Sequence, residues 1–579
     1  MSYSTHHDIP FSKVMRLFGQ VLSGEKSYIY LAIIYGISIS FLSLATPISV
    51  QMLINTVANT GLAIPLIVLS ATLFGLLALS GLLNALRVHL MELFARRFYA
   101  RMVSEITVKT IYSQNPFFAD EKKSALFNRY FDIIVVTKNI PILLIGAFTL
   151  ILQAGVGFAL VSFYHPFLLA FTVVFLFLLW LVWIIWGKSA ANAAMRLSRS
   201  KHNGAQWIED LGNSNGFFKS ERNIRHALAR SNAATEEYLR EHKSYFRKHF
   251  AQTLSLLFIY AIASAALLGL GGWLVIQGEL TLGQLVAAEL ILTAAFFGIS
   301  QLGSYLIYFY DLCASIEELS LFDEVTQEQA PNDLHHEREN SDLIVKNVEG
   351  TARGRKVRFN FEIKGASTVM AMTVNNSVSH LLTDLMQRHV EPKGGYIAFG
   401  GADIRDTESH ILRQEIVVID RPTIFETTMR EYLHLSSQGT DGVLDAIHAT
   451  GLEPVLAELE NGLDTHLSPT GWPMSTTEVM QLKLAGAILA KPQILVLGPL
   501  YDLVDELFIK KAIRLIRAGN PNASIIYFTN RHHDLSFDYY LYVGHEKQTV
   551  VNNYRRFFEI KQENAHTLKA FNEEISDAV

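Results

Sequence analysis

The chain has 579 residues, of which 50% are hydrophobic and only 18% charged, and its mean hydropathy is positive. This composition argues against a soluble multidomain enzyme and predicts a membrane half joined to a soluble half. A single cysteine, Cys313, excludes an internal disulfide framework, and the mild net charge of −5 gives no indication of nucleic-acid binding. The N-terminus has no apolar stretch behind basic residues, so no cleavable signal peptide is expected.

Six apolar segments have lengths near the ~20 residues that cross a bilayer as a helix. They are residues 28–50, 63–85, 140–162, 167–186, 254–275 and 282–305. The links within each successive pair are short and contain no Lys or Arg, whereas the links 87–139 and 187–252 are long and basic. Because Lys and Arg concentrate on the cytoplasmic side, both termini and both long links are expected in the cytoplasm of a bacterial inner-membrane protein.

Two features of this half call for a choice between explanations. Glu289 lies in the sixth segment, where an ionisable residue indicates a functional site, unless the segment starts later and Glu289 lies near the outer interface. His335 and His336 adjoin each other in the polar stretch 323–342. Two ligands are too few for a metal site, so this stretch is expected to be a solvated linker and no metal is predicted.

The second half carries an alternation of helices and buried strands. Residues 494–497 form an uninterrupted apolar run that suits a buried parallel strand, and residues 477–489 before it have a helical pattern stopped by Lys491 and Pro492. Further core strands are expected at 368–372 and 525–528. This order, with GGYIAFGGADIRD (394–406) between, resembles the ATPase domain of ABC transporters, and with the six spans the resemblance to ABC exporters covers nearly the whole chain.

The resemblance places the phosphate loop of that family at residues 373–381, TVNNSVSHL, which contain no glycine. One alignment puts Ser379 at the lysine position and His380 at the magnesium-binding hydroxyl, whereas another puts Val378 and Ser379 there. Asp420, or Arg421 in a second register, stands at the position of the glutamine that contacts magnesium and water. Neither alignment of the loop places a phosphate-binding residue at these positions.

The remaining motifs of the family are altered as well. The signature turn is MSTTE (474–478), which keeps only Ser475, and both carboxylates that should end the strand are replaced, by Gly498 and Pro499. Asn530 stands at the switch-histidine position. Asp505 closes the following loop. Asp502, Asp505 and Glu506 are expected to cap the next helix, the alternative being that one of them substitutes for a lost carboxylate. No cofactor is therefore expected, with ATP and magnesium bound only if residual affinity survives.

The two long links resemble the coupling segments of exporters. Each is helical in pattern and broken by turn residues, at Asn115-Pro116 and at 212–216, and each turn carries two aromatics: Phe117 and Phe118, then Phe217 and Phe218. These aromatics either pack within helical hairpins or contact the nucleotide domains as coupling helices do. Both turns lie at a similar distance along the chain beyond a span, which favours the coupling role. The expected fold is a polytopic α-helical domain (1–322), a linker (323–342) and an α/β ABC-ATPase-like domain with a C-terminal extension (343–579).

The sequence thus predicts an ABC-exporter-like membrane protein of export or secretion whose nucleotide domain does not hydrolyse ATP. It would act as a homodimer, or as the inactive half of a heterodimer with an ABC subunit. Two alternatives stay open: a structural or regulatory scaffold for a periplasmic adaptor or a separate ATPase, and an active ATP-driven exporter with relocated catalytic groups. The transported substrate is not indicated.

Overall fold

The computed structural model describes residues 11–59, 63–115, 124–328, 338, 340–437, 442–529, 531 and 536–560. It divides into two compact units, one of residues 1–113 and 117–327 and a second of residues 114–116 and 328–579. The linker predicted at 323–342 begins too early, because Asp323 and Glu324 still belong to a short helix, Leu321–Glu324, at the end of the first unit. His335 and His336 lie outside the described residues.

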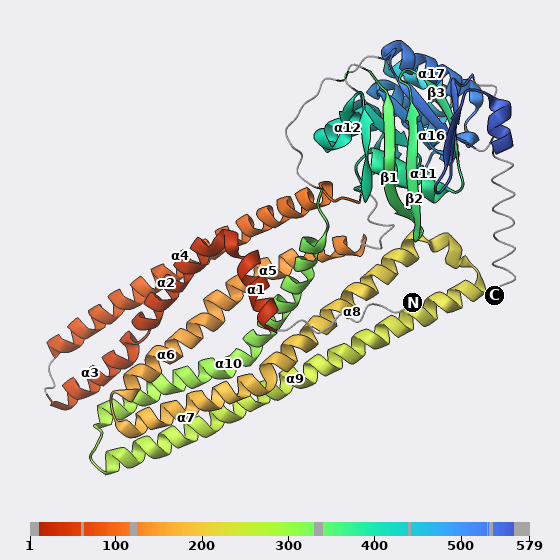
Figure 1. The fold of residues 1–579 in the computed structure, drawn as a ribbon. Helices are drawn as coiled ribbons and strands as arrows, with labels where there is room; N and C mark the ends of the chain where they lie inside the picture. Colours follow the sequence, from red (N-terminus) through yellow and green to blue (C-terminus); the bar gives the residue numbers. More distant parts are fainter. Residues whose placement is uncertain are drawn as a thin grey trace. The chain divides into compact units, whose positions relative to one another are not determined.

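The first unit is a bundle of long helices (Figure 1). Six helical segments among the described residues of this unit are long and apolar enough to cross a membrane, which confirms the six predicted spans. Their extents are Ser23–Ile54, Ile64–Ile111, Leu126–Ser162, Pro166–Asn213, Glu221–Ile276 and Leu282–Glu324. The helices are α1 (Phe11–Val21), α2 (Lys26–Leu42), α3 (Ala45–Asn59), α4 (Ala63–Ile111), α5 (Asp132–Ile142), α6 (Phe148–Ser162), α7 (Pro166–Val182), α8 (Lys188–Asn213), α9 (Glu221–Ile276) and α10 (Leu282–Ser320).

Several helices run far beyond their apolar parts, as the helical pattern of the long links predicts. Helix α9 has 56 residues and therefore extends over about 84 Å at the usual rise per residue. Its first half carries the basic residues of the second long link, and its second half is the apolar fifth span. One continuous helix thus joins a polar, solvated section to a lipid-facing one.

Two of the spans contain a π-helical turn. The first, η3 (Leu143–Ala147), joins α5 to α6 and comes two residues after Pro141, which cannot donate a helical hydrogen bond. The second, η4 (Trp183–Gly187), joins α7 to α8. Single π-turns inside α-helices occur frequently at functional sites.

The Arg87 side chain, only 2% exposed, contacts the first of these turns. Its guanidinium donates to the backbone carbonyl of Ile145 (3.3 Å), to the Asn84 side chain (2.8 Å) and to the Thr149 hydroxyl. All these acceptors are neutral. Because a buried cation without an acidic neighbour is costly, it requires several well-placed acceptors, which the π-turn helps to supply.

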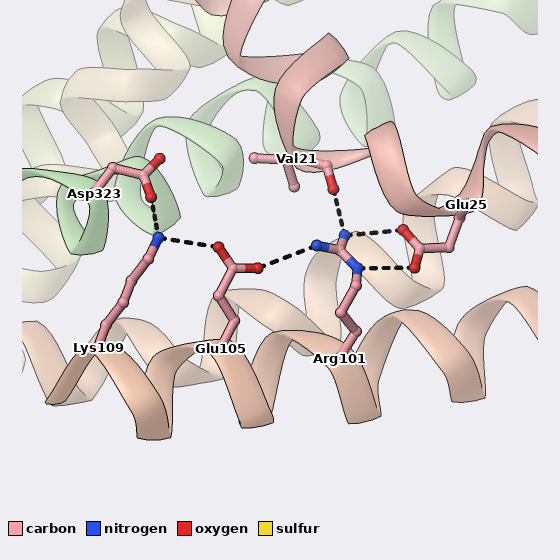
Figure 2. Close-up of polar contacts among 6 residues, drawn as sticks. All are labelled: Val21, Glu25, Arg101, Glu105, Lys109 and Asp323. Atoms are coloured by element: carbon pink, nitrogen blue, oxygen red, sulfur yellow. Dashed lines mark hydrogen bonds and ion pairs between the residues drawn. The ribbon is translucent and has the colours of Figure 1, made fainter. Parts of the chain in front are cut away.

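A row of ionic contacts ties the start of the first span to the end of the last (Figure 2). Arg101 on α4 donates two hydrogen bonds to the fully buried Glu25 (2.8 and 2.9 Å) and one to Glu105 (3.1 Å). Lys109, one turn further, pairs with Glu105 (3.0 Å) and with Asp323 after α10. Arg101, Glu105, Lys109 and Asp323 line a small cavity of about 100 Å³. The network therefore joins three segments that are far apart in the sequence.

The second unit is an α/β domain. Its main sheet has the order β12-β11-β3-β10-β9-β6, parallel except for the β11–β12 hairpin, and β2-β1-β4-β5 forms a separate antiparallel sheet. The strands are β1 (Leu343–Ala352), β2 (Arg355–Ile363), β3 (Thr368–Thr373), β4 (Gly394–Phe399), β5 (Ala402–Asp403), β6 (Ile416–Ile419), β7 (Thr427–Thr428), β8 (His466–Leu467), β9 (Ile494–Leu497), β10 (Ser524–Phe528), β11 (Tyr539–Val543) and β12 (Gln548–Val551). The helices are α11 (Asn376–Met386), α12 (Ser409–Glu415), α13 (Met429–Ser436), α14 (Val443–Thr450), α15 (Glu453–Glu458), α16 (Thr476–Ala490) and α17 (Glu506–Gly519).

The central strands of the main sheet are buried along their whole length. Every residue of β9 and β10 is buried, which confirms the buried strands predicted at 494–497 and 525–528. The helix predicted at 477–489 is α16, and it ends where Lys491 adopts a left-handed conformation (φ 48°) before Pro492. The pattern of apolar runs was therefore sufficient to find the core of this unit.

Candidate functional site

The carboxyl ends of the parallel strands bring together residues from three of the altered motifs. Helix α11 follows β3, Asp420 follows β6 directly, and Gly498 follows β9 directly. Ligands of open α/β sheets bind at this edge, outside the carboxyl ends of the strands. The side chains found here therefore decide which ligand the domain can accept.

An ion pair between His380 and Asp420 lies at this edge. The Nδ1 atom of His380 is 2.9 Å from Oδ2 of Asp420, and the two side chains are 38% and 18% exposed. The hydrogen bond to Asp420 raises the pKa of His380 above its usual value, against the effect of partial burial. Burial alone would raise the pKa of Asp420, but the hydrogen bond and charge of His380 outweigh it and lower that pKa. The two groups thus stabilise each other's charged form.

Gly498 packs directly against Asp420. A Cβ atom at position 498 would come 2.7 Å from both Cα and Cβ of Asp420, closer than real Cβ contacts allow. The Gly498 amide also donates to the Ile419 carbonyl (3.0 Å), which holds the two segments together. The glycine that replaces a carboxylate is therefore required by the packing of this structure.

A half-buried lysine of α16, Lys483, lies beside this pair. The ammonium of Lys483 donates to the backbone carbonyls of Arg421 (2.7 Å) and Thr423 (3.0 Å). Burial lowers the pKa of Lys483, and the charge of Asp420 opposes that effect. Lys483 thus fixes the segment after Asp420.

The N-terminus of α11 is capped by its own chain. The side-chain oxygen of Asn375 accepts the Val378 amide (3.2 Å) and the Ser377 hydroxyl (2.6 Å). Ser379 is 4% exposed, and its hydroxyl donates to the Asn376 carbonyl. A phosphate at a helix N-terminus needs amides such as that of Val378, and here the asparagine uses it.

The N-terminus of α16 is capped in the same manner, by a capping box. Oγ of Ser475 accepts the Glu478 amide (3.4 Å), and the Glu478 carboxylate accepts the Ser475 amide (2.7 Å). A carboxylate therefore lies at the helix end where a phosphate would need positive potential. Ser475, the residue of the signature turn that is kept, therefore caps its own helix.

These residues do not fit a magnesium nucleotide. The amides of Val378, Ser475 and Glu478 are hydrogen-bonded within the chain, Asp420 is bonded to His380, and the end of β9 carries Gly498 and Pro499 instead of carboxylates. Magnesium prefers carboxylate and other oxygen ligands, and phosphate needs free donors.

The acidic residues after β9 take different roles from one another. Asp505 caps α17 by accepting the Leu507 amide (2.8 Å), as predicted. Asp502 does not cap that helix, which corrects the prediction: its carboxylate accepts the Tyr527 (2.8 Å) and Thr529 (2.6 Å) hydroxyls. Those hydroxyls lie at the end of β10, so Asp502 joins two loops. Asn530 lies outside the described residues.

The predicted residues of the first unit are placed as follows. Phe217, in a short 3₁₀ turn (Asn215–Lys219), is 69% exposed, and Phe218 packs edge-on against Trp207. Phe117 and Phe118 lie outside the described residues.

Glu289 lies seven residues inside α10, where one carboxylate oxygen accepts the Thr293 hydroxyl (3.2 Å) and the other is buried without a hydrogen-bond partner.

Three residues of the candidate site were not anticipated from the sequence. The Ser475-Thr-Thr-Glu478 spacing is a capping-box pattern and could have identified Glu478. Asn375 two residues beyond an apolar strand is a recognisable N-cap. Nothing in the sequence indicates Lys483, because its carbonyl partners come from a segment some 60 residues away.

Comparisons with known proteins agree with this architecture. Residues 29–300 match the family model of the ABC transporter transmembrane region. The structure resembles that of a bacterial Atm1-family ABC exporter with ATP bound, with a TM-score of 0.76 and 17% identity over 91% of this chain and 96% of that one. At this identity the likeness establishes the fold alone.

Relatives by sequence are ABC proteins too. The ABC transporter ATP-binding protein YknU of Bacillus subtilis is 28% identical over 280 residues, or 45% of this chain and 47% of that protein. The multidrug transporter mdr2 of Aspergillus fumigatus is 23% identical over 89% of this chain and 68% of its own length. The leukotoxin translocation protein LktB of Mannheimia glucosida is 25% identical over 41% of this chain and 35% of its own length. The chain thus spans about half, or less, of several relatives it matches.

A helical bundle with six apolar spans, joined to an α/β domain with a mostly parallel sheet, defines an exporter-type membrane protein. The membrane part of the chain, residues 29–300, belongs to the family of ABC transporter transmembrane regions, and the chain as a whole has the fold of an ABC exporter.

Proposed function

We propose that this chain is an export subunit of the membrane that does not hydrolyse ATP itself. The observation that carries the proposal is the His380–Asp420 ion pair with Gly498 packed against it. Phosphoryl transfer depends on positioned charge and a metal, and the side chains at this edge neutralise each other instead. The capped N-termini of α11 and α16 support the same conclusion.

The test is equilibrium binding of a fluorescent ATP analogue with magnesium to the purified full chain in detergent, followed by phosphate release from the same sample. We expect no saturable binding and no release. His380→Ala and Lys510→Ala form a matched pair, because Lys510 pairs only with Glu506 on the side of α17 among the contacts seen. Saturable binding with turnover that His380→Ala reduces and Lys510→Ala leaves unchanged would overturn the proposal.

We further infer that the protein works as a dimer in a bacterial inner membrane with both termini in the cytoplasm. The exporter fold and the Lys- and Arg-rich sections of α4, α8 and α9 support this. The partner is a second copy or an ABC subunit with intact motifs. The native mass of the protein isolated from its own membrane distinguishes twice the 65.0 kDa chain mass from a mixed complex, and a 65.0 kDa species alone would contradict the inference.

A scaffold for a periplasmic adaptor or a separate ATPase remains an alternative within this proposal. Proteins named for leukotoxin translocation occur among the relatives, and the export of a polypeptide is one substrate class consistent with that similarity. Deletion of the chain should abolish export of a cargo if it is a transport subunit. A variant that restores export with the first unit alone would favour the scaffold role.

A further inference from the structure

Asp132 and His202 form a buried contact in the first unit. His202 lies on α8 and Asp132 is the first residue of α5, and their side chains are 7% and 2% exposed. Atom Nε2 of His202 is 2.8 Å from Oδ2 of Asp132, yet neither atom has a hydrogen-bond partner within the described residues. A buried carboxylate oxygen is costly unless a donor or an opposite charge compensates it. The contact therefore depends on a positive charge on His202.

Asp132 also contacts a third helix. Its Oδ1 atom accepts the Ser315 hydroxyl of α10 (3.0 Å) and lies 3.6 Å from the ammonium of Lys201 on α8. The Lys201 side chain is 52% exposed, so solvent screens its charge. Asp132 therefore joins α5, α8 and α10 at one point, and His202 is the buried cation beside it.

Two arginine pairs flank this point and join the same segments. Arg199 of α8 pairs with Glu317 of α10, and Arg129, three residues before α5, pairs with Glu318 of α10 (2.6 Å). Arginine and carboxylate side chains ordinarily keep their charges around neutral pH, whereas the charge of histidine ordinarily changes between about pH 5 and 8. The charge of His202 is therefore the part of this junction that a change of pH near neutrality can alter.

The charged groups around His202 are balanced when its ring is protonated. The junction of α8, α10 and the start of α5 contains four acids and four bases, namely Asp132, Asp311, Glu317 and Glu318 with Arg129, Arg199, Lys201 and His202. Two further elements pack on α8 and carry charges there: α9, antiparallel to α8, has Glu236, Glu237 and Arg240 at the level of His202, and α1 has Lys13 and Arg16. Loss of the His202 proton would leave one acid of the junction without a matching base.

We propose that His202 and Asp132 form a proton-sensitive clamp, which holds α8 against α5 and α10 while His202 is protonated and releases it as pH rises. Residues 132, 202 and 315 all lie outside the apolar segments 140–162, 167–186 and 282–305, so water on one side of the membrane supplies the proton. Helix α10 precedes the second unit in the chain, so the clamp controls the end of the helix that leads to that unit. The clamp consists of contacts within the first unit and is independent of ATP hydrolysis by the second.

The chain contains a natural reporter for this clamp. Cys313, its only cysteine, is fully buried on α10 two residues before Ser315. It packs against Val14 of α1 and Met195 of α8, so a maleimide reaches its thiol when these helices separate. The experiment measures the labelling rate of Cys313 in the full chain in nanodiscs at pH 6 and pH 8.5. Each rate is divided by the rate for the same protein unfolded in SDS, which removes the pH dependence of the thiol reaction itself.

We expect the relative labelling rate of the wild type to rise at least fivefold from pH 6 to pH 8.5. His202→Gln, which has no charge, should label rapidly at both pH values, and His202→Arg, which is charged at both, should label slowly at both. His226→Gln, at an exposed histidine of α9, is the matched control and should keep the wild-type rise. Equal wild-type rates at the two pH values, or a rise that persists in folded His202→Gln, would overturn the proposal.

Two further variants separate the clamp from general loosening of the protein. Asp132→Asn removes the partner of His202 and should also abolish the pH dependence, and a rise retained in this variant would contradict the clamp. Cys313→Ser/Ala485→Cys moves the thiol to a fully buried position of α16 in the second unit and should show no rise. An equal rise at position 485 would mean that the whole protein loosens, and it would also overturn the proposal. All variants are first compared with the wild type by thermal unfolding at both pH values.

Discussion

His380 and Asp420 form an ion pair of 2.9 Å across the sheet edge where an ABC ATPase would bind its nucleotide. They come from two different altered motifs, the phosphate loop and the glutamine segment. Asp420 is in turn packed against Gly498, which replaces a carboxylate of a third motif. The changes in three motifs, which are separate in the sequence, therefore involve residues that contact one another in the structure.

The ion pair predicts a pH-dependent stability. The raised pKa of His380 means that its contribution is fully present below about pH 6.5 and is lost as pH rises through its folded-state pKa. The lowered pKa of Asp420 means that its contribution is present above about pH 4 and is lost as pH falls through its folded-state pKa. Between these limits Asp420→Asn should destabilise the protein by about 1 kcal/mol, a figure reduced because His380 is 38% exposed.

The measurement is the unfolding midpoint of wild type and Asp420→Asn in detergent at pH 5.5 and pH 9. The difference between the proteins should be largest at the lower pH and should shrink at the higher one, where His380 is neutral. A difference of the same size at both pH values would contradict a charged pair.

Restoration of the lost carboxylate at position 498 should fail on steric grounds. Gly498→Asp and Gly498→Ala should both destabilise the protein, by about 1–3 kcal/mol, because any Cβ there meets the Asp420 backbone at 2.7 Å. Gly519→Ala is the control, since a Cβ at that position would make only ordinary contacts with Lys491. Equal unfolding midpoints for the Gly498 and Gly519 variants would show that the strand end can relax.

Ser475 should contribute to the stability of the protein and not to nucleotide binding. Ser475→Ala removes one half of the capping box of α16 and should cost about 1 kcal/mol. Thr476→Ala, at the next position on the exposed side, should change stability by less than about 0.5 kcal/mol. Chemical unfolding of both variants in detergent separates the two effects, and the prediction is wrong if their midpoints coincide.

The ion pairs of Figure 2 should contribute unequally to the stability of the protein. Glu25→Gln leaves Arg101 without its buried partner and should cost about 2 kcal/mol or more, because the Glu25 carboxylate is fully buried. Asp323→Asn should cost at most about 0.5 kcal/mol, because Asp323 is 52% exposed and Lys109 keeps Glu105. Thermal unfolding in detergent checks the order, and a larger loss for Asp323→Asn would contradict it.

Much of the fold could be predicted from the sequence because its signals are local. A span must satisfy its own backbone in lipid, so about 20 apolar residues in a row suffice to indicate a helix, as at 282–305. Strands buried on both faces are apolar throughout, so Ile494–Leu497 needed no partner to be recognised. The lack of glycine at 373–381 and of carboxylates at 498 and 499 was likewise visible in the chain itself.

The tertiary structure alone decided how those altered positions are filled. His380 meets Asp420, and Lys483 meets the carbonyls of Arg421 and Thr423, through strand order and helix packing that join residues 40 to 62 positions apart. The same holds for Arg87 at the π-turn of Ile145 and for His202 beside Asp132. Hydropathy and spacing describe neighbours along the chain, whereas charge pairing and close packing depend on distances through space.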